Sequence, residues 1–178
     1  MIIPGFVISI VTFPGVIIHE LAHQIFCMLC GMKIYEVKYF QPKNPCGYVI
    51  HEPSDRPLHV FLTAMGPFFI NTILGMLILL PASIEILEFR DYTSYPLNLV
   101  LAWLGISILM HSFPSTGDAK VMVKQILKNP DVGIFWKVLA APFVGLIYLF
   151  SIGSMFWLDL VYAMAVGMLL PNLLVHLF

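Results

Sequence analysis

The chain begins with an apolar run, residues 1–32, that contains the sequence His19-Glu20-Leu21-Ala22-His23. On a helix, residues four apart project from nearly the same face, so both imidazoles can hold one metal ion. Glu20 lies one step around the helix, where its carboxylate can reach a water molecule on that ion. This pattern is typical of a zinc site with two histidine ligands and a glutamate general base. The alternative is three unrelated polar residues at a helix–helix interface, but ionisable groups at membrane depth are costly and usually functional.

The composition indicates an integral membrane protein. The chain is 60% hydrophobic and 11% charged, with a mean hydropathy of +0.92, whereas soluble domains carry about 25% charged residues. Its 178 residues suffice for about five spans and predict one domain, residues 1–178, without a separate soluble part. The net charge of −1 gives no basic face for nucleic acid, so we expect none as a partner. No Lys or Arg precedes the apolar run, so we expect no cleavable signal peptide.

We therefore predict an all-α polytopic membrane protein with about five transmembrane helices. The apolar stretches that supply them are Ile2–Cys30, Leu58–Ala82, Leu97–Phe113 and Ile134–Phe178. The last stretch is long enough for two helices of about 20 residues, with a turn at Ser151–Ser154. One long tilted helix followed by an interfacial segment is the alternative. Pro14 either opens the motif helix or kinks a longer one.

The nine Lys and Arg residues predict an orientation in the bilayer. Four lie between residues 33 and 56, one is Arg90, and four lie between residues 120 and 137. Because positive residues favour the cytoplasmic side, the first and third loops should face the cytoplasm. The N-terminus then lies outside, and His19 and His23 lie in the cytoplasmic half of the first span. We predict a multi-pass protein whose active site faces the cytoplasm.

Asp118 is the candidate for a third metal ligand. A catalytic zinc site uses three protein ligands and one open position for water, and Asp118 lies just past the cytoplasmic end of the third span, at the depth of the histidines. The alternative is that Asp118 caps a short helix over residues 119–127. His111, near the end of the third span, is next in line as a ligand or as a supporting group.

The loop after the first span predicts a small cytoplasmic β-hairpin. Residues 33–40 and 47–51 are rich in aromatic and β-branched residues, and a proline-bearing turn at 41–45 separates them. An open strand edge can pair with an extended substrate peptide; alternatively, the tyrosines anchor the hairpin at the lipid headgroups. Cys27 and Cys30 form a Cys-x-x-Cys pair, which we interpret as small apolar residues of the motif helix rather than a redox or zinc site.

Over roughly residues 10–125, the chain resembles the site-2 protease family of intramembrane zinc metalloproteases. The motif helix corresponds to the family's first core helix, the sequence Gly66–Asn71 to a Gly-Pro-x-x-Asn-like motif in the second, and Asp118 to the aspartate ligand at the third. Asn71 falls one residue later than usual, and Thr-Gly-Asp-Ala replaces the usual Leu-Asp-Gly. The resemblance implies Zn²⁺ as the cofactor, Asn71 as a substrate-binding residue, and a sheet-like element after the motif helix. Residues 134–178 lie outside this core.

The predicted function is hydrolysis of peptide bonds in a membrane protein or membrane-proximal peptide. Zinc held by the two histidines and Asp118 would activate water, and Glu20 would move its proton to the leaving amine. Two alternatives are a non-proteolytic metal-binding membrane protein and a small transporter with an ion path. Glu20 favours the enzyme, because a structural metal site needs no base. Asp159, an acid in the last apolar stretch, could line a polar path, pair with another helix or mark the interface.

Overall fold

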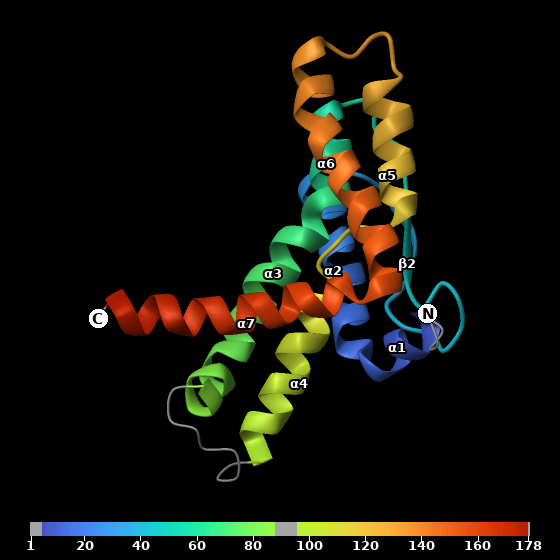
Figure 1. The fold of residues 1–178 in the computed structure, drawn as a ribbon. Helices are drawn as coiled ribbons and strands as arrows, with labels where there is room; N and C mark the ends of the chain where they lie inside the picture. Colours follow the sequence, from blue (N-terminus) through green and yellow to red (C-terminus); the bar gives the residue numbers. More distant parts are fainter. Residues whose placement is uncertain (1–4, 88–95, 178) are drawn as a thin grey trace.

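The computed structural model describes residues 5–87 and 96–177. It is mostly helical, and one small sheet follows the second helix (Figure 1). The elements, in chain order, are α1 (Gly5–Val11), α2 (Phe13–Leu29), β1 (Ile34–Lys38), β2 (Tyr48–His51), α3 (Pro57–Leu87), α4 (Pro96–Met110), α5 (Thr116–Met122), the π-helical turn η1 (Val123–Leu127), α6 (Ile134–Gly153), the 3₁₀ turn η2 (Ser154–Phe156) and α7 (Leu158–Leu177). The motif His19–His23 therefore lies on α2, as predicted.

Two of these helices, α3 and α6, are long and apolar enough to cross a membrane, which suits the chain to membrane association. A third span results if α1 and α2, bent by 92° at their junction, are counted as one. The described helices therefore support two or three of the five predicted spans. One reason is that α4 has 15 residues, about 22 Å at a rise of about 1.5 Å per residue, less than the hydrocarbon core of about 30 Å. Arg90 lies outside the described residues.

The bend at the start of the motif helix follows from its sequence. Pro14 lies in the first turn of α2, where a missing N–H breaks no bond inside the helix. Thr12, the residue between α1 and α2, donates its hydroxyl to the carbonyl of Ile8 on α1 at 2.8 Å. Pro14 therefore opens the motif helix, as one of the two predicted alternatives has it, and does not kink a longer helix.

The predicted break near Ser151–Ser154 is confirmed. α6 ends at Gly153, and Trp157 adopts a left-handed conformation (φ 64°) between η2 and α7. This turn sends α7 away from α6 at a steep angle (Figure 1), so that α7 packs against α3 and α4. The last apolar stretch therefore forms two helices and not one long tilted helix.

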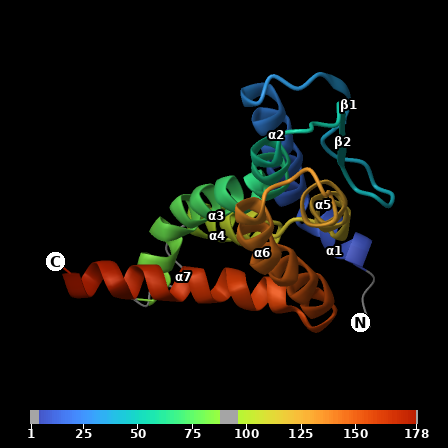
Figure 2. The same cartoon turned by 90° about the horizontal axis from the view of Figure 1, so that it is seen from above.

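α3 is the central element, since it contacts α2, α4, α5, α6 and α7. The predicted hairpin is also confirmed: β1 and β2 are antiparallel, from Ile34 opposite His51 to Lys38 opposite Tyr48. Figure 2 shows the hairpin beside α2 on one side of the molecule and α7 along the other. The hairpin is tied to α2 by a hydrogen bond from the hydroxyl of Tyr39 to the side-chain carbonyl of Gln24. These contacts hold the hairpin next to the motif helix.

Candidate metal centre

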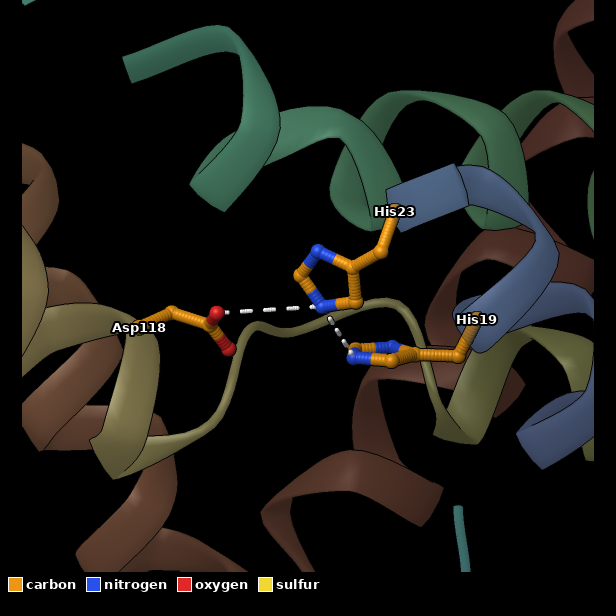
Figure 3. A group of neighbouring side chains, drawn as sticks. All are labelled: His19, His23 and Asp118. Atoms are coloured by element: carbon orange, nitrogen blue, oxygen red, sulfur yellow. Dashed lines mark hydrogen bonds and ion pairs between the residues drawn. The ribbon is translucent and has the colours of Figure 1, made fainter. Parts of the chain in front are cut away.

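The two motif histidines lie on successive turns of α2 and converge. Their Nε2 atoms are 3.2 Å apart, and the rings meet edge to face with centroids 4.9 Å apart. Figure 3 shows both side chains extending from α2 toward Asp118, which comes from α5. His23 is 8% exposed. The i, i+4 spacing therefore brings two imidazole nitrogens to one point, as predicted.

Hydrogen bonds to backbone carbonyls determine which nitrogen each ring presents. The Nδ1 of His19 lies 2.7 Å from the carbonyl oxygen of His111, and the Nδ1 of His23 lies 2.9 Å from that of Thr63. A carbonyl only accepts, so both Nδ1 atoms carry a proton and, in the neutral rings, both Nε2 atoms carry a lone pair. Two lone pairs that face each other at 3.2 Å repel, and a cation between them removes the repulsion.

Asp118 offers a third ligand atom and also takes part in a capping box at the start of α5. Its Oδ1 lies 3.7 Å from the Nε2 of His23. Its Oδ2 accepts from the backbone N–H of Ser115 at 2.8 Å and from the Ser115 hydroxyl at 2.6 Å, and the Ser115 hydroxyl accepts from the backbone N–H of Asp118. Ser115 is thus the N-cap and Asp118 the third helical residue of a capping box. The alternative prediction, that Asp118 is itself the N-cap residue of the short helix, is therefore wrong. Each carboxylate oxygen has a separate partner, so capping and ligation are compatible.

The donor set fits zinc. One ligand atom from each of His19, His23 and Asp118 lies within 4.8 Å of the others. In a tetrahedral site with bonds of about 2.0–2.1 Å, ligand atoms lie about 3.3 Å apart. The observed distances are 3.2 Å between His19 and His23 and 3.7 Å between His23 and Asp118, and the third pair, His19 and Asp118, lies within 4.8 Å. Two imidazole nitrogens and one carboxylate oxygen leave the fourth position for water, as in catalytic zinc sites.

Glu20 lies beside this group, and the hairpin loop closes over it. Its side chain is 8% exposed and, with His19, lines a cavity of about 540 Å³. A Cβ atom at Gly47 would lie 2.6 Å from the Cγ of Glu20 and 3.0 Å from its Oε1. Only glycine therefore lets the loop approach this closely. Asp159 lines the same cavity, so of its three predicted roles the lining of a polar path is the one that the structure favours.

A second cavity, of about 320 Å³, reaches the group from the side of Asp118. Its walls include Thr63 of α3 and the β2 residues Ile50 and His51. One cavity therefore meets His19 and Glu20, and the other meets Asp118. The candidate metal centre therefore borders two cavities.

Asn71 and His111 occupy supporting positions. Asn71 is fully buried, and its Nδ2 donates to the carbonyls of Gly15, Ile108 and His111 at 3.1–3.3 Å. Substrate binding by Asn71 stays a prediction that this burial does not favour. The His111 ring bonds to the hydroxyl of Thr12 at 2.8 Å through Nε2, and its ring is not part of the three-ligand group.

Sequence reasoning missed two partners of the candidate ligands: the Thr63 carbonyl, which bonds His23, and Ser115, which bonds Asp118. The signal for Ser115 was present, because Ser115-x-x-Asp118 is a capping-box pattern. Of the cysteine pair, Cys27 is fully buried and free and Cys30 is half-buried and free, as expected of small apolar residues of the helix.

No protein-family model, curated protein or solved structure matches this chain. The resemblance to the site-2 proteases rests on the sequence motifs and stays a prediction.

Proposed function

We propose that the chain is an intramembrane zinc metalloprotease that hydrolyses peptide bonds within or close to a bilayer. One observation carries the proposal. One ligand atom from each of His19, His23 and Asp118 lies within 4.8 Å of the others, and Glu20 stands next to His19 on the same helix. A metal site that serves only to stabilise a fold is closed by protein ligands and needs no base.

A zinc ion in this group would lower the pKa of a water molecule toward about 7 and polarise a peptide carbonyl. The Glu20 carboxylate accepts a proton from the attacking water and donates it to the leaving amine. The loop at Gly47 holds the Glu20 side chain at the edge of its cavity. His19 and His23 are fixed in orientation by their Nδ1 bonds to backbone carbonyls.

The substrate is an extended segment of a membrane protein or of a membrane-proximal peptide. Gly47 lines the cavity at Glu20, and Val49, Ile50 and His51 line the cavity at Asp118. This short run of chain therefore passes both approaches to the candidate metal centre. Among the residues that the structure describes, no strand pairs with the side of β2 away from β1, and this side offers backbone groups to an extended peptide.

The proposal includes the finer membrane topology. The lysine-bearing first and third loops lie on the cytoplasmic side, the N-terminus lies outside, and the active site faces the cytoplasm. The chain is multi-pass, with about five crossing segments, of which the bent pair α1–α2 is the first. α4, with 15 residues, is the short crossing.

Cleavage of a single-span substrate by purified protein in lipid vesicles tests the function. We expect cleavage that chelation stops and zinc restores, and that Glu20→Gln abolishes without loss of bound zinc. Glu85→Gln near the far end of α3 makes the same chemical change away from the site and should cleave normally. Zinc binding without any cleavage by the wild type would favour the non-proteolytic metal-binding protein. Ion flux through the vesicles without zinc binding would favour the transporter.

A further inference from the structure

The carbonyl that holds His23 belongs to a turn of α3 in which a proline removes the usual donor. In a regular helix the carbonyl of residue 63 accepts from the N–H of residue 67. Pro67 lies inside α3 and has no N–H, and its ring presses against that carbonyl. The Thr63 oxygen instead accepts the Nδ1–H of His23 at 2.9 Å. The proline thereby frees the acceptor that orients a metal ligand.

The carbonyl that orients His19 is that of His111, which lies just past the end of α4 and accepts no helical hydrogen bond. α4 stops at Met110, and the N–H of Ser115, which would bond the His111 carbonyl in a continued helix, is bonded to the Oδ2 of Asp118. The carbonyl of His111 accepts from the Nδ1 of His19 at 2.7 Å and from the Nδ2 of Asn71 at 3.1 Å. Asn71 is on α3 and also bonds Gly15 of α2, so it fixes this carbonyl relative to the motif helix.

Gly66 completes the arrangement, because it permits α2 and α3 to approach closely. A Cβ at this position would lie 2.2 Å from the ring of Phe26 on α2. The three residues Gly66, Pro67 and Asn71 therefore each act on the spacing or on the hydrogen bonds between α3 and the motif helix.

We propose that Pro67 and Asn71 are positioning residues of the candidate metal centre: Pro67 frees the Thr63 carbonyl for His23, and Asn71 holds the His111 carbonyl for His19. This assigns Asn71 a role in metal geometry instead of substrate binding. It rests on the metal centre put forward in the proposed function. Neither residue belongs to the three-ligand group, and each acts through one backbone oxygen.

Titration with Co²⁺, whose visible spectrum reports coordination geometry, tests Pro67 against a proline of the same helix. Pro67→Ala restores the N–H that competes for Thr63, and we expect metal affinity to fall about 10- to 100-fold, as for lost supporting bonds in other sites, with a changed Co²⁺ spectrum. Pro81→Ala also removes a proline inside α3, away from the site, and should bind as the wild type does. Removing a helix breaker does not weaken a helix, so a purely structural role of Pro67 predicts no loss of affinity.

Asn71→Ala tests the second residue, with Thr72→Val as its control. Thr72 is adjacent on α3 and bonds the hydroxyl of Tyr162 at 2.8 Å, so its variant loses one interhelical hydrogen bond without touching His111. We expect weaker binding and a changed spectrum for Asn71→Ala only. If Asn71→Ala does not fold, Pro67→Ala decides alone. If Pro67→Ala and Asn71→Ala both keep the wild-type metal affinity and Co²⁺ spectrum, the positioning role is refuted and the proposed function is not affected. If the wild-type protein binds no metal, the proposed function is contradicted as well.

Discussion

Replacing Asp118 with alanine separates its two roles. The carboxylate gives Oδ2 to the capping box with Ser115 and Oδ1 to the group with His23. Asp118→Ala removes both contributions. Ser115→Ala breaks the side-chain half of the same capping box and leaves the Oδ1 of Asp118 in place, so it is the matched control.

The loss of the helix cap and the loss of the metal ligand differ in their free-energy cost. Removing a helix cap costs about 1 kcal/mol of stability, and we expect this cost in both variants. Loss of a supporting hydrogen bond weakens metal sites about 10- to 100-fold, and a direct ligand contributes more. Asp118→Ala should therefore lower zinc affinity at least about 100-fold, which corresponds to about 2.7 kcal/mol. The ligand loss thus exceeds the cap loss in Asp118→Ala, and only the cap loss is present in Ser115→Ala.

Competition with a chromophoric zinc chelator measures the affinity, and thermal unfolding of chelator-treated protein measures the cap. We expect similar unfolding temperatures for the two metal-free variants and weak zinc binding only for Asp118→Ala. Equal zinc affinity in Asp118→Ala, Ser115→Ala and wild type would refute ligation by Asp118. The third ligand would then have to come from another residue.

Three further outcomes follow from the same geometry. His19→Ala and His23→Ala should each lose stoichiometric zinc by elemental analysis, and full occupancy in folded variants would contradict their assignment. Gly47→Ala places a methyl group 2.6 Å from the Cγ of Glu20, and such overpacking costs about 1–3 kcal/mol. Because the methyl group displaces the base, kcat should fall about 100-fold with zinc retained. An unchanged kcat would show that the loop does not press on Glu20. Lys43→Cys should react with a membrane-impermeant thiol reagent from the cytoplasmic side in a cysteine-free background, and labelling from outside only would reverse the orientation.

The local features of the fold were predictable because they depend on neighbouring residues. The i, i+4 spacing of His19 and His23 predicts their convergence, and the Ser151–Ser154 segment predicts the break that ends α6. The two strands follow from their aromatic and β-branched residues around the proline-bearing turn. The same kind of pattern, Ser115-x-x-Asp118, predicts the capping box once it is looked for.

The remaining features depend on contacts between distant segments. Apolar windows do not show that α1 and α2 meet at 92° or that α4 has 15 residues, so the described helices support only two or three of the five predicted spans. The burial of Asn71 and its bond to His111 require α2, α3 and α4 to be packed together. A family motif gave the position of Asn71 but not its contacts.

X-ray absorption at the zinc edge of purified protein tests the metal centre most directly. His19, His23 and Asp118 predict one zinc per chain with only nitrogen and oxygen neighbours at about 2.0–2.2 Å. The histidine scattering should weaken in His23→Ala. A sulfur neighbour at about 2.3 Å would place the metal at a cysteine such as Cys27 instead and would contradict the centre formed by α2 and α5.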